Sequence, residues 1–458
     1  MALEGHKDDL MRCTRCSYCK WVPHQVMEDT RFLTVCPSIE RFKFHSWSAG
    51  GRLISALSLL RGRTEFTDTF LDVVYQCQMC GACDVSCKVE RDLEPYEVMQ
   101  DLRTRCVEEG EVPAPHMAVI EGLKQHDNML EQPKERRGDW AAGPAVGVSS
   151  AGPLPARTPE ASGGRVGSLQ PAKFDRLPGV KDLTKESAEV LFHAGCRYSY
   201  DEGLWPTVRD GLTLLAEAGV DVGILGREEN CCGGRSYEMG YVGELAKYAQ
   251  HNTDTWRTAG IKTVVTACAD CYQTFKVLYD KNGSAPSVEI LHITEFIDRL
   301  VKQGKIKLTR KVPLTVTYHD PCHLGRLAEP WVHWEGKRVK VRGQMLIHDP
   351  PKKKRCGAGG VYDAPRAILR AIPGLHFVEM YRIKEYAWCC GAGGGVREAY
   401  PEFAAWTAGQ RLEEAKAVGA EALVSACGWC KRSFTDAATE TGRQMRTYDV
   451  TELVRQAL

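Results

Sequence analysis

Short apolar segments alternate with amphipathic ones from residue 190 to the carboxyl terminus. Segments typical of buried strands cover residues 190–193, 220–225, 261–266, 314–318, 376–380 and 422–425. Between them, apolar residues recur at the spacing of one helix face in segments such as 206–218 and 237–258. Such alternation is typical of parallel sheets with helices on their faces. The pattern therefore predicts two α/β domains with parallel sheets, over residues 186–311 and 312–458.

The amino-terminal third has a different pattern. Helical periodicity covers residues 52–74 and 95–108. Residues 132–173 are rich in Gly, Ala, Ser and Pro without periodicity, which is linker composition. We therefore expect an α+β multidomain chain that begins with a helical domain over 1–130 and continues through a flexible linker over 131–185.

Length and composition set limits on the class of protein. The 458 residues fit about three domains, and 43% apolar and 26% charged residues are typical of globular proteins. The net charge of +1 gives no reason to expect a nucleic-acid or membrane surface. The amino terminus is polar, and the longest apolar runs, such as 53–60, are too short to span a bilayer. We expect a cytoplasmic protein that meets a membrane only through a partner.

Five cysteines recur in the same order in the two predicted α/β domains. In each, a lone cysteine precedes a Cys-Cys-Gly segment, and a Cys-x-x-Cys pair follows. The two sets are Cys196, Cys231, Cys232, Cys268 and Cys271, and Cys322, Cys389, Cys390, Cys427 and Cys430. From the doublet to the pair is 36 positions in the first set and 37 in the second. This matched spacing indicates an internal repeat.

Every cysteine group of the repeats follows the carboxyl end of a predicted strand. These ends share one edge of a parallel sheet, so the five thiols of each repeat are expected to meet there. A structural zinc site would use only four of them. Thiolate-rich sites without histidine at ligand spacing favour iron–sulfur clusters, and glycines after the doublet let the backbone approach closely. A zinc-binding scaffold module and inert vicinal thiols are the alternatives.

Eight further cysteines lie in the first ninety residues. They occur as Cys13, Cys16, Cys19 and Cys36, and as Cys77, Cys80, Cys83 and Cys87. This is a two-cluster ferredoxin pattern, in which the last cysteine of each group usually serves the other cluster. We assign Cys13, Cys16, Cys19 and Cys87 to one cluster, and Cys36, Cys77, Cys80 and Cys83 to the other. The long first spacing and Lys88, where a proline is expected, depart from the compact bacterial pattern. A pair of zinc knuckles is the alternative.

Two cysteines are left over, and one of them lies in an insert of the second repeat. Cys106 falls in a helical segment and is interpreted as a buried thiol. Cys356 lies in the insert 331–360, which carries eight Lys or Arg residues and two tryptophans. A solvated loop and a docking surface for an acidic partner are equally good interpretations of the insert. No G-x-G-x-x-G fingerprint is present, so no nucleotide site is expected.

The doublet, its glycine and the flanking cysteines resemble the CCG cysteine-rich domain. A helical two-cluster ferredoxin domain followed by two such domains resembles the D-type subunit of heterodisulfide reductase over nearly the whole chain. It is also similar to the iron–sulfur subunits of glycolate and lactate oxidising complexes. Residues 319–326, the long insert and 385–395 resemble the D-type subunit of tungsten-containing benzoyl-CoA reductase complexes.

The resemblance implies an iron–sulfur electron-transfer subunit of an anaerobic oxidoreductase complex. It implies two cubane 4Fe-4S clusters and one noncubane cluster on each complete five-cysteine set, with reduction of a small disulfide as a further activity. The expected partners are a flavin-containing or haem b subunit. His193 and His319 each precede the first cysteine of a repeat by three positions. They are candidate proton donors to a leaving thiolate, although a structural histidine at a strand end is the more frequent case.

Overall fold

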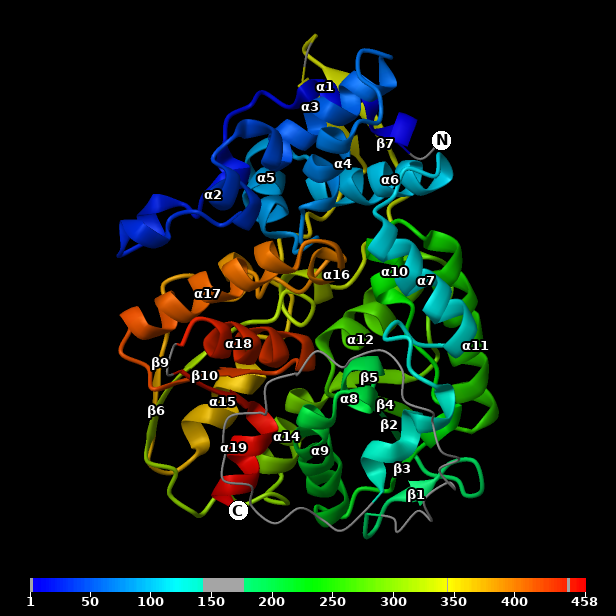
Figure 1. Ribbon diagram of the computed structural model, residues 1–458, viewed down its shortest axis with the longest axis vertical. Coiled ribbons are helices and arrows are strands. Elements are labelled where there is room, and N and C mark those ends of the chain that lie inside the picture. The colour runs from blue at the N-terminus through cyan, green and yellow to red at the C-terminus, as the bar shows by residue number, and fades with distance from the viewer. Residues whose placement is uncertain (1–2, 143–176, 344, 443–444) are drawn as a thin grey trace, which may run out of the picture.

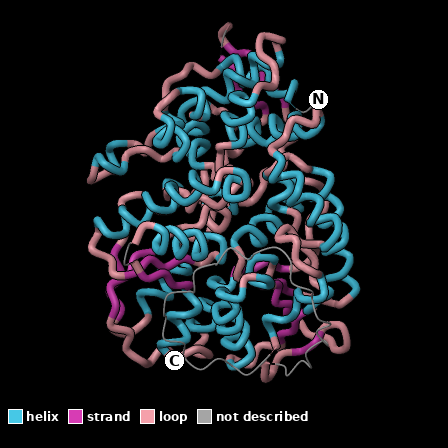
Figure 2. The backbone as a smooth tube through the Cα atoms, viewed as in Figure 1, coloured by secondary structure: helices cyan, strands magenta, loops and turns pink. Residues whose placement is uncertain are grey.

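Two parallel sheets lie at the centres of the two repeats (Figure 2). The first has the strand order β1-β3-β2-β4-β5, and the second has β9-β6-β10-β11. Their strands are β1 (Lys181–Asp182), β2 (Val190–His193), β3 (Val222–Ile224), β4 (Thr263–Thr266), β5 (Glu289–His292), β6 (Leu314–Tyr318), β9 (Leu375–Val378), β10 (Ala422–Ser425) and β11 (Arg446–Asp449). The order β3-β2-β4-β5 matches β9-β6-β10-β11, so both repeats share one topology. The prediction of parallel sheets is confirmed.

The computed structural model describes residues 3–142 and 177–458, apart from 344 and 443–444. Figure 1 shows the helical amino-terminal domain above the two repeats, with the first repeat in green and the second in yellow to red. Among the helices in these described ranges, none is both long enough and apolar enough to cross a membrane.

Helices cover the sheets and complete each repeat. They are α8 (Cys196–Tyr200), α9 (Trp205–Glu217), α10 (Gly234–Glu238), α11 (Val242–Thr258), α12 (Ala269–Gln273), α13 (Tyr279–Lys281) and α14 (Ile293–Lys302), then α15 (Asp363–Ala371), α16 (Val396–Ala399), α17 (Pro401–Ala417), α18 (Gly428–Glu440) and α19 (Val450–Ala457). The single helix predicted over 237–258 is divided into α10 and α11. Gly240, with φ of +104°, lies between them and packs closely against the Arg103 carbonyl, where a side chain would collide.

The two repeats pack against each other reciprocally. Helix α9 of the first repeat contacts α19 of the second, and α14 of the first contacts α15 of the second. Because α9 corresponds to α15 and α14 to α19, this is the arrangement of a pseudo-two-fold pair. Buried polar contacts join the same surfaces, among them Lys431 and Thr207, whose side chains lie 2.9 Å apart. This packing fixes the relative positions of the two sheet edges after which the cysteines follow.

The amino-terminal domain is built from short helices around its own apolar core. They are α1 (Lys7–Arg12), α2 (Pro37–Phe42), α3 (Ala49–Leu60), α4 (Asp68–Tyr75), α5 (Ala82–Arg91), α6 (Pro95–Glu108) and α7 (Ala114–His126). The periodic segment 52–74 is two helices, because the Thr67 side chain caps a new helix by accepting from the Phe70 N–H. The helix expected over 95–108 matches α6.

Most of the predicted linker, residues 143–176, lies outside the described residues. Its two ends are ordered. The 3-10 helix η6 (Lys134–Ala141) packs on α8 and α9 and buries Arg137 and Trp140, and β1 forms an edge strand of the first sheet. Both ends therefore belong structurally to the first repeat rather than to a flexible connection.

The basic insert forms an antiparallel hairpin of β7 (Lys337–Val341) and β8 (Met345–Asp349). It pairs with acidic groups of the amino-terminal domain: Arg338 lies 2.6 Å from Asp9, and Lys352 lies 3.2 Å from Glu94. The acidic surface that the insert contacts is thus part of the same chain. This accounts for part of the charge of the insert, that of Arg338, Lys352 and Lys354, without an external partner.

Candidate metal centres

The first ferredoxin-type set lies around one cavity. Cys13, Cys16, Cys19 and Cys87 line this cavity beside Gly50, whose backbone N–H lies near the Cys19 sulfur. Helix α5 carries Cys87 to this cavity from the other cysteine group. Cys16 is exposed, whereas Cys19 and Cys87 are buried. The structure thus brings together the four cysteines that the spacing assigned to one set.

The second set lies deeper in the domain. Cys36, Cys77, Cys80 and Cys83 line a second cavity, in which Cys36 comes from the distant group. The backbone N–H of Ala82 lies near the Cys80 sulfur, and that of Ile39 lies near the Cys36 sulfur. Thiols only, with backbone N–H groups directed at sulfur, are the donor set of an iron–sulfur cluster. The residues present fit that group at both cavities.

In the first repeat the five cysteines form one connected group. The thiols of Cys196 and Cys231, of Cys231 and Cys232, of Cys232 and Cys271, and of Cys271 and Cys268 lie next to each other. All five thiols are buried. Gly195, with φ of +79°, approaches so closely that a β carbon there would lie 2.8 Å from the Cys271 sulfur. The carboxyl ends of β2 and β4 thus meet at one point.

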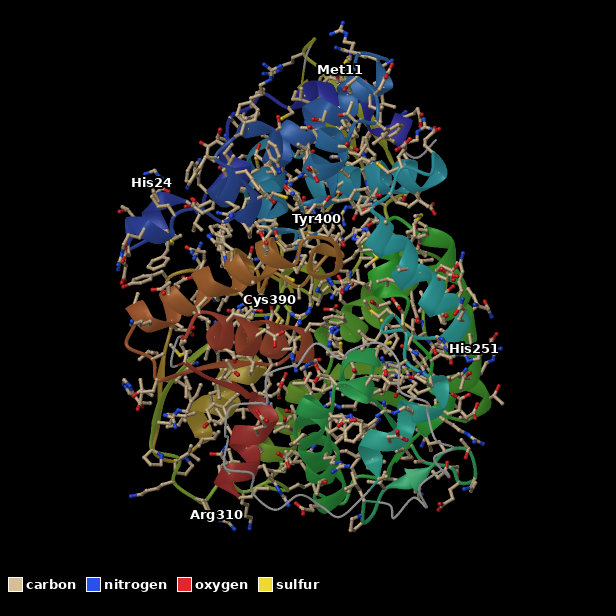
Figure 3. The ribbon with its side chains drawn as sticks, viewed as in Figure 1. Met11, His24, His251, Arg310, Cys390 and Tyr400 are labelled. Carbon is tan, nitrogen blue, oxygen red and sulfur yellow. The ribbon has the colours of Figure 1, made fainter. Side chains whose placement is uncertain are left out.

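The second repeat reproduces this connectivity. The thiols of Cys322 and Cys389, of Cys389 and Cys390, of Cys390 and Cys430, and of Cys430 and Cys427 lie next to each other. Figure 3 shows Cys390 in the interior, between α17 and α18. In both repeats the glycine after the doublet donates its N–H to the first sulfur of the doublet: Gly233 to Cys231 at 3.4 Å, and Gly391 to Cys389 at 3.3 Å.

Contacts between cysteines join the second ferredoxin-type set to the second repeat, and the second repeat to the first. The Cys80 thiol of the amino-terminal domain lies beside that of Cys389, and the Cys268 thiol of the first repeat lies beside that of Cys427 in the second. The contact with Cys389 lowers the pKa of Cys80 to about 6, and the Arg326 guanidinium acts in the same direction against burial. No sequence spacing indicated these contacts between sets.

The later glycines of the second copy serve contact between domains. Gly393 lies against the backbone of Gln78, and Gly394 lies against that of Cys77. Gly395 lies against the His116 ring, and its carbonyl oxygen is 2.8 Å from the His116 Nε2. The sequence interpretation, close approach to a cluster, does not account for these glycines, and at Gly391 a β carbon would meet the Ala404 carbonyl of α17, although the Gly391 N–H donates to the Cys389 sulfur. They let the second repeat approach the ferredoxin-type site.

The two candidate proton donors are buried histidines that pack in the same way. His193 lies edge-on against Phe275 with ring centroids 4.9 Å apart, and His319 lies against Phe434 at 4.8 Å. Burial lowers the pKa of both. The His319 ring nitrogen and the Cys390 and Cys430 sulfurs lie within 4.8 Å of one another. His319 therefore lies directly beside the second set.

His323 and two carboxylates form a buried network that sequence spacing did not assign. The His323 ring lies 2.6 Å from Glu238 and 3.0 Å from Asp270, both of the first repeat, and 3.4 Å from the Cys322 sulfur. Burial acts to lower the pKa of His323, but the Asp270 and Glu238 carboxylates outweigh it and raise that pKa well above its ordinary value. Arg235 lies 2.6 Å from Asp270 and completes the network.

The two leftover cysteines lie apart from the sets. Cys106 is buried in α6 beside Tyr75, in agreement with the prediction of a buried thiol. Cys356 is half-buried and lines a pocket with Lys88, Arg355 and Trp331. Neither side chain shows a contact with another cysteine among the described residues.

Two sequence families match the chain. The 4Fe-4S dicluster domain matches residues 9–90, and the cysteine-rich CCG domain matches 190–276, 316–364 and 360–435. The D-type subunit of dihydromethanophenazine:CoB--CoM heterodisulfide reductase from Methanosarcina mazei is 31% identical over 98% of this chain and 94% of its own length. The chain belongs to the family of heterodisulfide reductase D-type subunits.

Other relatives agree with this membership. The D-type subunit of the same reductase from Methanosarcina acetivorans is 30% identical over 98% of this chain and 94% of its own length. EtfAB:quinone oxidoreductase of Syntrophomonas wolfei is 25% identical over 84% of this chain and 47% of its own length. This family member is an iron–sulfur electron-transfer subunit of an oxidoreductase, and it works with partner subunits. These relatives favour iron–sulfur clusters over the zinc alternative.

Proposed function

We propose that the chain holds four iron–sulfur clusters arranged in series. Two cubane 4Fe-4S clusters would take the ferredoxin-type sets, and one noncubane cluster would take each five-cysteine set. The observation that supports this is the pair of contacts Cys80–Cys389 and Cys268–Cys427, which place neighbouring ligand sets side by side. When bound, such clusters supply one-electron transfer. The cysteines of this chain hold them in a fixed order, from the exposed Cys16 to the buried first repeat.

Iron analysis tests the number of clusters. Anaerobically purified protein is expected to contain about sixteen irons per chain, because four complete thiolate sets are present. A content of about eight irons or fewer, or stoichiometric zinc in a colourless protein, would contradict the proposal.

Reduction of a disulfide is a second candidate activity, favoured by the contact between the two five-cysteine sets. The S–S bond of a substrate would take two electrons and two protons and leave as two thiols. His193 and His319 are candidate proton donors at these sets. With an artificial one-electron reductant, cleavage of a small disulfide is expected to exceed the rate without protein. An unchanged rate, with full iron content, would leave electron relay as the function.

The identity of the partner is also a proposal. A flavin-containing or haem b subunit fits, because no flavin or nicotinamide fingerprint occurs in the sequence. Such a partner is expected to copurify from the native source, and a complex without flavin or haem would contradict it. Cytoplasmic location, the alternative of a glycolate or lactate dehydrogenase complex, and the likeness to benzoyl-CoA reductase complexes likewise stay predictions.

A further inference from the structure

An arginine outside the repeats reaches the first five-cysteine set. Arg137 lies in η6, within the segment of linker composition, and is 1% exposed. Its Nη1 donates to the Cys196 sulfur at 3.5 Å. Nη1 also donates to the Asp127 carbonyl at 3.4 Å, and Nη2 donates to the Asn230 carbonyl at 3.0 Å. The guanidinium thus lies between the lone cysteine and the residue before the doublet.

A buried carboxylate fixes this arginine in place. Glu229 accepts from Arg137 Nη2 at 2.9 Å and from Nε at 3.2 Å. The same carboxylate accepts the backbone N–H groups of Ala194 and Gly195, at 2.9 and 3.0 Å. These two residues lead directly into Cys196. Arg137 and Glu229 therefore hold both the sulfur and the backbone of this cysteine.

In the second repeat a different residue lies beside the lone cysteine. At Cys322, which corresponds to Cys196, the group at hydrogen-bond distance is the His323 ring, 3.4 Å from the sulfur, while Arg326 acts on this thiol only through its charge. A guanidinium is always charged, and it donates in a fixed geometry. The two five-cysteine sets thus have the same thiols but different donors to the lone cysteine.

We propose that Arg137 is a positioning residue that raises the reduction potential of the first-repeat site by donating a hydrogen bond to Cys196. This rests on the proposed function, since it requires a cluster on the five-cysteine set. A charged donor to a ligand sulfur stabilises the additional negative charge of the reduced state. The segment around η6 is therefore part of the redox site and not only a connection between domains.

Arg137→Gln and Arg137→Lys test the proposal in the full chain. Both are made in a Cys390→Ser background, so that the EPR signal that remains from the five-cysteine sets comes from the first repeat. Iron content and an EPR-monitored redox titration are measured. For Arg137→Gln, the ratio of reduced to oxidised first-repeat site at a fixed potential is expected to fall about tenfold, which corresponds to about 59 mV for a one-electron couple. Arg137→Lys keeps the charge and is expected to shift the ratio less.

Arg136→Gln is the matched control. Arg136 lies in the same 3-10 helix, pairs with Asp139 and Glu202 at 3.2 and 3.1 Å, and is 43% exposed at its side chain. Its substitution should leave the potential unchanged. An unshifted potential in Arg137→Gln, or loss of first-repeat iron in both Arg137 variants, would overturn the tuning role. If the Cys390→Ser protein itself shows no EPR signal from the first-repeat site, this result would instead contradict the proposed cluster sites.

Discussion

Cys390→Ser is expected to remove or convert the second-repeat cluster, with a loss of up to about four of roughly sixteen irons. Cys390 is buried and connects Cys389 to Cys430 within the second set. A serine oxygen is a harder and weaker ligand for this iron than thiolate, and Gly391, which follows, offers no replacement ligand. Iron content and EPR spectra of the anaerobic protein are the measurements. The two ferredoxin-type signals should persist, because their cavities have their own cysteines.

Cys389→Ser should have a wider effect than Cys390→Ser. The Cys389 thiol lies beside Cys80 of the second ferredoxin-type set as well as beside Cys322. Its substitution is therefore expected to change the spectrum of that set in addition to removing the second-repeat signal. The cysteine spacing alone predicts that all ferredoxin-type signals survive either substitution, whereas the contact between Cys80 and Cys389 leads us to expect this for Cys390→Ser only.

Cys356→Ser is the control for both substitutions. Cys356 lies in the insert, is half-buried and has no counterpart in the first repeat. Its substitution should leave all four signals intact. Loss of a signal in Cys356→Ser, together with four intact signals in Cys390→Ser, would show that the five-cysteine sets are assigned wrongly.

Much of the fold could be predicted because its signals are local. Strands such as 190–193 and 422–425 are short apolar runs, and cysteines follow their carboxyl ends, so the parallel topology brings those thiols together. The grouping of the amino-terminal cysteines likewise follows from spacing, since Cys87 and Cys36 line the cavities expected for them.

The contacts between sets could not be predicted, because they depend on how domains pack. Cys80 and Cys389 are far apart in the sequence, and nothing in the spacing relates them. Arg137 lies in a segment whose composition indicates a linker, so its burial has no local signal. The insert shows the same limit: its charges suggested an external partner as readily as a solvated loop, but Asp9 and Glu94 of the same chain meet them.

Arg103→Ala is expected to lower the free energy of unfolding by about 4 kcal/mol, because it leaves several buried carbonyl groups without a donor. Arg103 is fully buried in α6. Its guanidinium donates to the carbonyls of Cys77 and Gly394, both at 2.7 Å, and of Glu238 at 2.8 Å, and it also reaches Val74 and Tyr75. Anaerobic urea unfolding, followed by the loss of cluster absorbance, measures the change.

The same substitution should weaken the junction between the amino-terminal domain and the second repeat. Arg103 joins the loop of Cys77 to the glycine run that follows Cys390, and this junction holds Cys80 beside Cys389. Arg105→Ala is the matched control. Arg105 lies on the same helix with a partly exposed side chain that pairs with Glu4 and Glu109, so its loss should cost about 1 kcal/mol or less. Equal stability of the two variants would show that Arg103 does not hold this junction together.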